Sequence, residues 1–99
     1  MRKFSVSKPA QSDMRVILKY TFEQWGMEQA VRYAQGLQDC FQVLAESPEA
    51  GRACDEISKH LRRHEHGKHV VFYRLNQTGI RIVRVLHGQM VPVKSQFEQ

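Results

Sequence analysis

The sequence predicts an α+β fold in which an N-terminal strand precedes an antiparallel helical hairpin packed on a small antiparallel β-sheet. Residues 8–46 repeat apolar side chains at spacings of three and four, whereas residues 61–87 contain β-branched runs divided by turn residues. A chain of 99 residues can bury only one modest core. We therefore expect a single domain spanning residues 1–99.

The first elements expected are a short strand and a helix. Phe4 and Val6 fall on one side of RKFSVS, which is typical of a strand. Ser7 can cap the following helix, whose first turn tolerates Pro9. The apolar stripe of this helix consists of Ala10, Met14, Ile17, Leu18, Thr21 and Trp25. Gly26 ends the helix, and we expect Trp25 to pack that end into the core, although an exposed tryptophan would be an interaction anchor.

The second helix has the cleanest helical period in the sequence. Its apolar residues are Ala30, Tyr33, Ala34, Leu37, Cys40, Phe41 and Leu44. Pro48 and Gly51 stop it. We expect Cys40 to be buried on this helix and Cys54 to lie in a loop, with both thiols reduced. The alternative is a disulfide between them.

Three strand segments follow: LRRHEHG, KHVVFYRL and GIRIVRVLH. The last two form a hairpin through a loop of either two residues (77–78) or four residues (76–79), and both loops give the same pairing. The pairs expected on one face are Leu75–Ile80, Tyr73–Ile82, Val71–Arg84 and His69–Leu86. We expect the other face, with Val70, Phe72, Val83 and Val85, to meet the helices, and the Arg74–Arg81 pair to form an exposed tip. The face of Tyr73, Arg84 and His69 would then be a surface for a partner.

Positive charge is confined to the second half of the chain. Residues 1–51 hold six basic and six acidic side chains, so the formal net charge of +5 falls in residues 52–99. An acidic partner should therefore meet that half. No stretch approaches the roughly 20 apolar residues of a membrane span, and the N-terminus lacks a signal-peptide core, so we expect a cytoplasmic protein without a membrane partner.

Catalytic, metal and DNA-binding motifs are weak. His60, His64, His66 and His69 are close in sequence, but no fourth ligand follows at fixed spacing, so we expect neither a metal nor another cofactor. A ribonuclease could draw cations and one titrating group from Arg62, Arg63, Lys68, Arg81, Arg84 and His87. The final segment MVPVKSQFEQ supplies no convincing acid–base pair, however. No basic recognition helix appears, so we expect no direct sequence-specific binding of nucleic acid.

One ordered set of motifs, from PAQSDM to Met90, closely resembles the ParE toxins of the RelE/ParE superfamily. The motifs are Trp25-Gly26, Pro48-x-x-Gly51-Arg52, Asp55-x-Ile57, Leu61-Arg62, Gly67-x-His69-x-x-Phe72-Tyr73-Arg74 and Ile82-x-Arg84-x-Leu86-His87-x-x-Met90. Each is common alone, but their order and spacing are specific. The sequence departs from the family pattern at Val91, where aspartate is common, and in the tail PVKSQFEQ.

The resemblance implies a RelE/ParE-like fold and a toxin of a type II toxin–antitoxin system. Such a toxin inhibits DNA gyrase by binding it, blocks replication, and is neutralised by a ParD-like antitoxin. It also implies a protein without catalytic residues, because ParE toxins typically lack those of the similar RelE ribonucleases. The alternatives are a RelE-like ribosome-dependent messenger RNA endoribonuclease and a degenerate toxin that only binds antitoxin.

The residues expected to bind antitoxin or target lie in the basic half. They are Arg62, Arg63, His69, Tyr73, Arg81, Arg84, His87 and Met90. Arg84 has an equal alternative, an ion pair with an internal acid such as Asp55, since a partly buried arginine needs a carboxylate or carbonyls. Arg52 is expected to be structural, bonding carbonyls at the helix end.

Overall fold

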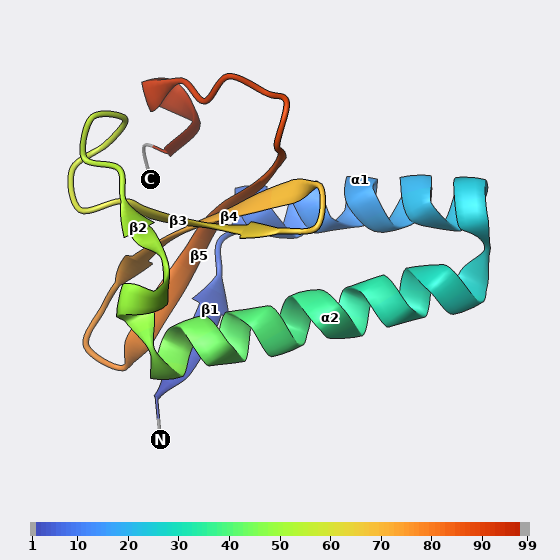
Figure 1. The fold of residues 1–99 in the computed structure, drawn as a ribbon, viewed down its shortest axis with the longest axis horizontal. Coiled ribbons are helices and arrows are strands. Elements are labelled where there is room, and N and C mark those ends of the chain that lie inside the picture. Colours follow the sequence, from blue (N-terminus) through green and yellow to red (C-terminus); the bar gives the residue numbers. More distant parts are fainter. Residues whose placement is uncertain (1, 98–99) are drawn as a thin grey trace.

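The computed structural model describes residues 2–97, so residues 1, 98 and 99 of the expected domain lie outside it (Figure 1). Two helices and five strands form an α+β fold, which is the class that the sequence predicts. The elements are β1 (Lys3–Val6), α1 (Lys8–Trp25), α2 (Met27–Glu46), the 3-10 helix η1 (Pro48–Ala50), β2 (Arg52–Ala53), β3 (Arg62–His66), β4 (His69–Leu75), β5 (Gly79–His87) and the 3-10 helix η2 (Lys94–Phe97).

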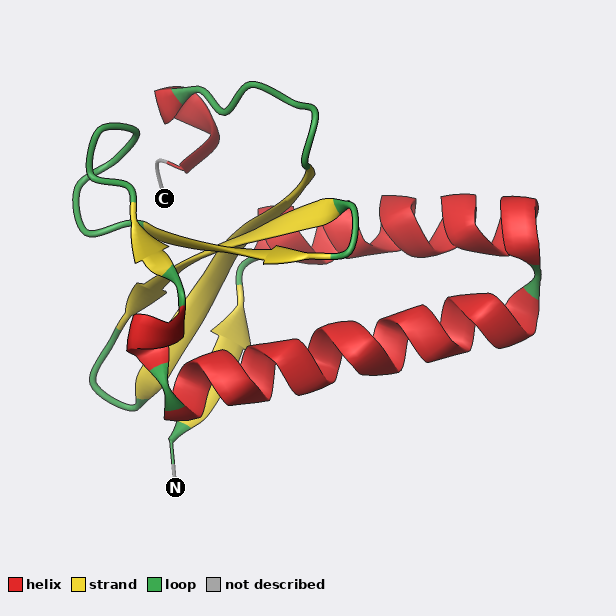
Figure 2. Cartoon of the chain, viewed as in Figure 1, coloured by secondary structure: helices red, strands yellow, loops and turns green. Residues whose placement is uncertain are grey.

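Ser7 fixes the start of α1 and ties it to the sheet. Its buried Oγ accepts a hydrogen bond from the Ala10 amide (3.1 Å) and donates one to the Val83 carbonyl of β5 (2.7 Å). This confirms the predicted cap. At the other end, Gly26 has φ 93°, a conformation that favours glycine and lets α2 begin one residue after α1 ends. The resulting helical hairpin extends well beyond the sheet (Figure 2).

The sheet is mixed, which corrects the expected all-antiparallel sheet. Its strand order is β1-β5-β4-β3-β2, and β1 runs parallel to β5 with Phe4 opposite Ile80. Parallel neighbours require a long connection. The elements between β1 and β5 in the sequence provide that connection. The short strand β2, paired with Arg62 and Arg63 of β3, was not predicted either.

A β-bulge changes the register between β4 and β5. Near the turn, Leu75 faces Ile80 and Tyr73 faces Ile82, as predicted. The register then shifts between Phe72 and Tyr73, so the predicted Val71–Arg84 and His69–Leu86 pairs are wrong. The pairs beyond the bulge are Phe72–Arg84, Val71–Val85, Val70–Leu86 and His69–His87. One extra residue on β5 accounts for the difference.

The helices cover the face of the sheet opposite to the one predicted. The buried cluster that includes α1 and α2 takes from the sheet Val71, Tyr73, Ile80, Ile82 and Val85. The opposite face carries Val70, Phe72, Val83 and Leu86, packed with Cys54, Leu61 and Phe97. The connection before β3 and the C-terminal segment therefore cover that face, on the side of the sheet away from α2 (Figure 2). Both faces are closed over most of the sheet.

Candidate partner-binding groove

Tyr73 belongs to the core, so it is not part of a partner surface. Its side chain is 0% exposed, and its hydroxyl donates to the Pro48 carbonyl (2.5 Å) and accepts from the Gly51 amide (3.0 Å). A Cβ on Gly51 would lie 2.2 Å from the Tyr73 hydroxyl oxygen, so only glycine fits there. Arg62 completes the cluster by donating to the Gly51 carbonyl. The Pro-x-x-Gly turn is therefore a structural device that gives a buried tyrosine its partners.

Arg84 pairs with an internal acid, but the acid is Asp13 and not Asp55. The Arg84 Nε and Nη2 atoms lie 2.7 and 2.8 Å from the two carboxylate oxygens of Asp13. This bidentate bond raises the pKa of Arg84, against a smaller lowering by burial. The same carboxylate accepts a hydrogen bond from the Val85 amide (3.0 Å), so Asp13 also gives a backbone amide at the edge of β5 its partner. Asp55 instead accepts from the His60 amide (2.7 Å).

The remaining arginines are held in different ways. Arg63 lies over the Phe72 ring at 5.3 Å, on the face that carries the C-terminal cover. The predicted Arg74–Arg81 pairing is confirmed. Arg81 is exposed, as expected for the tip, whereas Arg74 is half-buried and donates to the Phe97 carbonyl (3.2 Å) and to Ser58 Oγ. The structural role expected for Arg52 is not supported by a helix-end contact; its exposed guanidinium pairs with Glu65 at 3.0 Å.

A groove of about 730 Å³ opens where the hairpin passes the end of the sheet. It lies between α1, the start of α2, the β3–β4 turn and the end of β5. The residues that line it are Asp13, Val16, Ile17, Tyr20, Thr21, Trp25, Gln29, Tyr33, Gly67, Lys68, His69, Arg84, Val85, Leu86, His87 and Met90. The candidates His69, Arg84, His87 and Met90 come together here, whereas Arg62, Arg63, Tyr73 and Arg81 do not.

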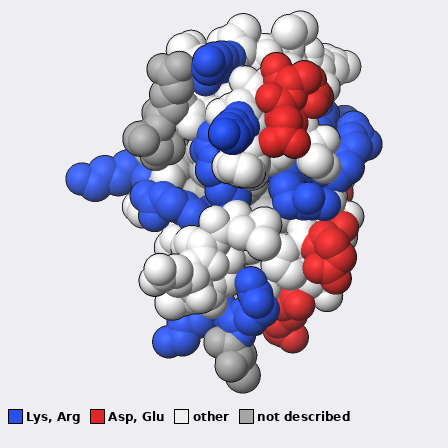
Figure 3. All heavy atoms as spheres, turned by 90° about the vertical axis from the view of Figure 1, so that its left-hand side faces the viewer, with Lys and Arg blue, Asp and Glu red and all other residues white. Residues whose placement is uncertain are grey.

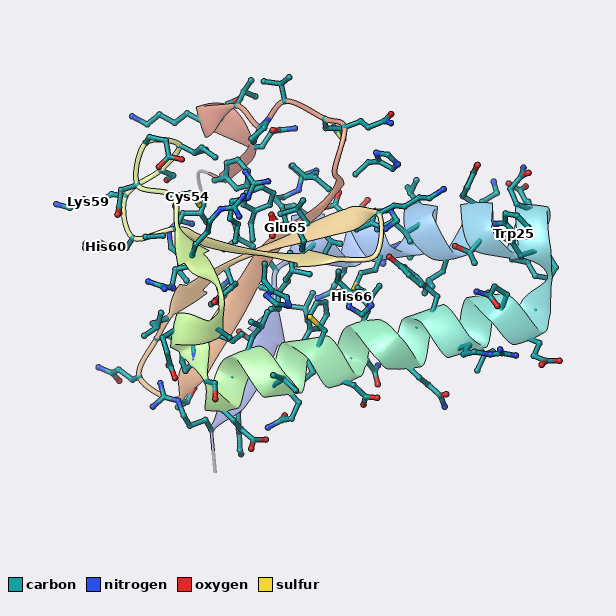
Figure 4. All side chains as sticks on the ribbon, in the orientation of Figure 1. Trp25, Cys54, Lys59, His60, Glu65 and His66 are labelled. Atoms are coloured by element: carbon teal, nitrogen blue, oxygen red, sulfur yellow. The ribbon has the colours of Figure 1, made fainter. Side chains whose placement is uncertain are left out.

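The α1 wall of the groove is apolar and exposed. Val16, Tyr20 and Trp25 are 67%, 62% and 72% exposed, so the expectation that Trp25 packs into the core is wrong. Figure 4 places Trp25 at the far end of the hairpin, beyond the sheet. Exposed apolar side chains that share one concave surface are typical of an interaction site. The signal in the sequence is that Val16 and Tyr20, four residues apart, widen the apolar stripe of α1 beyond what its core face needs.

The opposite wall contains His69, His87 and Tyr33, and His66, which does not line the groove, packs against Tyr33. Tyr33 Oη lies 2.6 Å from His69 Nδ1, and the His69 and His87 rings meet edge to face at 5.5 Å. The His66 ring lies 5.7 Å from that of Tyr33. Burial lowers the pKa of His69, with smaller contributions from His87 and His66, and burial followed by His64 lowers the pKa of His66. Burial also raises the pKa of the Tyr33 hydroxyl, with a smaller contribution from Cys40.

The described residues offer no compact metal centre. Between residues 2 and 97, no three His, Cys, Asp or Glu side chains are placed to hold a metal ion. Cys40 and Cys54 are free thiols, and Cys54 is the more buried of the two, contrary to the expected order. Burial raises the pKa of both thiols, which disfavours the reactive thiolate. In the same residues, neither long helix is apolar enough to cross a membrane.

Similarity to known proteins adds to this geometry. A model of the family described as "ParE toxin of type II toxin-antitoxin system, parDE" matches residues 4–92. A curated relative named Toxin ParE1 from Mycobacterium tuberculosis is 39% identical over 89 residues, which cover 89% of this chain and 91% of the relative. Toxin ParE1 from Caulobacter vibrioides is 38% identical over 90 residues, covering 91% and 93%.

A solved structure shares the fold. It is described as the chromosomal ParDE TA system from P. aeruginosa, and the matched chain superposes with a TM-score of 0.73 at 18% identity. The match covers 88% of this chain and 96% of that chain. The observed arrangement of two helices on a five-stranded sheet is therefore one that a solved protein also adopts.

Proposed function

This chain belongs to the family of ParE toxins of type II toxin–antitoxin systems, and from this premise we propose that it is a non-catalytic toxin that inhibits DNA gyrase by binding it. A ParD-like antitoxin, encoded beside it, holds it inactive. Both events take place in the cytoplasm. The observation that carries the proposal is the apolar groove between the helical hairpin and the end of the sheet.

The groove suits an amphipathic segment of an antitoxin. Val16, Tyr20 and Trp25 offer an apolar wall to one side of such a segment. The other wall has Lys68 as its free cation, because Asp13 neutralises Arg84. Helix-in-groove recognition uses this combination of apolar anchors and charged rim. The solved ParDE system, whose toxin has this fold, supports a ParD-like partner.

A binding role is favoured over ribonuclease chemistry by where the cations lie. Lys68, Arg84 and His87 line the groove, whereas the other three candidates for phosphate binding, Arg62, Arg63 and Arg81, lie outside it. Arg62 and Arg84 are also held by structural partners. A site that stabilises a scissile phosphate needs its cations aimed at one point.

The charged surface supports the same view. Figure 3 looks at the end of the molecule opposite to the hairpin tip, and there Lys and Arg side chains alternate with Asp and Glu. Glu65 of β3 is likewise paired with Arg52 of β2. A continuous basic track is what binding to a nucleic acid backbone favours.

The test is a gyrase supercoiling and cleavage assay with the purified chain, run with and without the product of the neighbouring gene. A ribosome-dependent messenger-cleavage assay is run beside it. We expect gyrase inhibition or trapped cleavage complexes, reversed by the neighbour, and intact transcripts. Transcript cleavage with unaffected gyrase would establish the RelE-like alternative. Silence in both assays with antitoxin binding retained would establish a degenerate toxin.

A further inference from the structure

Three histidines and Tyr33 form a connected row at the groove, contributed by four elements. His69 of β4 lies between Tyr33 of α2 and His87 of β5, and Tyr33 also contacts His66 of β3. Figure 4 shows His66 between the β3–β4 hairpin and α2. The rings are 5.5 to 5.7 Å apart, centre to centre, so protonation of one is felt by the next.

The charged groups around this row are almost all cationic. The β3–β4 turn contributes Lys68, β3 contributes His64 beside His66, and β5 contributes Arg84. From α1 comes the carboxylate of Asp13, which is engaged by Arg84 on both oxygens. The three ion pairs found among residues 2–97 leave these histidines without a carboxylate partner.

Because these neighbouring groups are cationic, protonation of His69 is unfavourable until an anion binds beside it. Burial and the neighbouring rings hold the pKa of His69 below its usual value. A carboxylate placed against the exposed edge of His87 and beside Lys68 would attract a proton to His69, because an opposite charge within about 4–6 Å favours the charged form. Binding of that carboxylate would then be linked to proton uptake.

We propose that Lys68, His69 and His87 form a carboxylate-binding subsite at the basic end of the groove, and that occupation of this subsite by an acidic side chain of the antitoxin takes up protons. The proposal rests on the proposed function, since it assigns the antitoxin as the occupant. The apolar side of the antitoxin segment lies on Val16 and Tyr20. Its acidic side meets the subsite, so mild acidification tightens the complex.

The test is isothermal titration calorimetry of the full chain with the neighbouring gene's product. Titrations at pH 6.5 and 8.5 in two buffers of different ionisation enthalpy give the number of protons taken up. We expect net uptake at pH 6.5 and close to none at pH 8.5. The dissociation constant should fall from pH 8.5 to pH 6.5, by at most about tenfold per pH unit for each proton taken up.

Two matched substitutions locate the protons. His87→Asn keeps an acceptor for the Gln89 amide, which His87 Nδ1 bonds at 3.1 Å, so the fold should be preserved. This variant removes one side of the subsite and should reduce the uptake, and His87→Asn combined with His69→Gln should abolish it. His60→Asn is the control, because His60 is exposed in the connection before β3 and asparagine tolerates its φ of 63°. The control should bind as the natural chain does.

The outcomes separate the subsite from the proposed function. Tight binding without proton uptake, or uptake that persists in the double variant, would overturn the subsite and leave the antitoxin assignment intact. Absence of any binding to the neighbour's product would overturn the proposed function and the subsite together. Uptake that disappears with His87 and His69, but not with His60, would establish the subsite.

Discussion

The turn around Tyr73 and the groove beside Trp25 both contain residues of the family motifs, yet they use those residues in opposite ways. Around Tyr73 the side chains are buried and each polar atom of the tyrosine has a partner inside the chain. In the groove, Trp25 and Met90 are exposed, and no segment of residues 2–97 fills the space beside them. Membership of a motif therefore does not separate structural from binding residues, whereas burial and internal partners do. Substitutions of buried residues with internal partners should therefore cost stability, and substitutions of exposed groove residues should cost affinity.

The largest expected effect on stability comes from Asp13→Ala. This change leaves the Arg84 guanidinium, with a side chain only 20% exposed, without its carboxylate and removes the acceptor of the Val85 amide. We expect a loss of roughly 3 kcal/mol in the free energy of unfolding, measured by urea denaturation. Glu28→Ala is the matched control, because Glu28 pairs with Arg32 on the exposed surface and should cost under about 0.5 kcal/mol. Equal costs for the two variants would contradict the buried-pair assignment.

Tyr73→Phe should have the next largest effect. The ring still fills the core, but the Pro48 carbonyl and the Gly51 amide lose their common partner. A loss of about 2 kcal/mol is expected from two unsatisfied buried groups. Thermal unfolding checks it, and antitoxin affinity measured below the unfolding temperature should not change. A large drop in affinity with normal stability would show that Tyr73 contributes to the binding surface after all.

Trp25→Ala should reverse that pattern. Trp25 is 72% exposed, so its removal should leave stability within about 0.5 kcal/mol of the natural chain. Antitoxin affinity should fall at least about tenfold if the ring is an anchor, as measured by calorimetry. Phe22→Ala is the control, since Phe22 is exposed on the same helix but does not line the groove. The groove assignment fails if Phe22 matters as much as Trp25.

The smallest effect concerns pH. The pKa values of His66 and His69 are lowered in the folded chain, so the unfolded chain binds more protons and stability rises with pH. The contribution is present above the unfolded pKa of about 6.5 and is lost as pH falls through the folded values. We expect the free energy of unfolding of the free toxin to fall by less than about 1 kcal/mol between pH 7.5 and 5.5. His66→Gln should reduce that fall. A free energy of unfolding that rises on acidification would contradict the lowered pKa values.

The helices and strand limits could be predicted because local signals mark them. Ser7, Gly26 and Gly67 are cap and turn residues that act within a few positions, and the helical period of residues 27–46 is clear. The register of β5 could not be predicted beyond the bulge. A bulge needs no particular residue in the sequence, and one extra residue exchanges the two faces of a strand. The slip placed Arg84 instead of Val85 on the face of Tyr73, so the face that meets the helices was predicted to be amphipathic.

The sequence did not predict a groove. It predicted that a partner would meet the basic half of the chain after residue 51, and the candidates His69, His87 and Met90 from that half do line the groove. Its apolar half comes from α1, far away in sequence. The position of α1 depends on how the hairpin crosses the sheet, which no short-range pattern encodes. Arg84 also lines the groove, but its charge is neutralised by Asp13, a residue whose role depends on that same crossing.

The most direct test of the central claim is hydrogen–deuterium exchange of the chain with and without the neighbouring gene's product. The account predicts slower exchange on binding in α1 and in the segments 66–69 and 85–90 that border the groove. The 54–61 segment and the C-terminal η2, which cover the other face, should exchange as in the free chain. Protection confined to those covering segments, with the groove unchanged, would show that the partner binds the opposite face and would contradict the account.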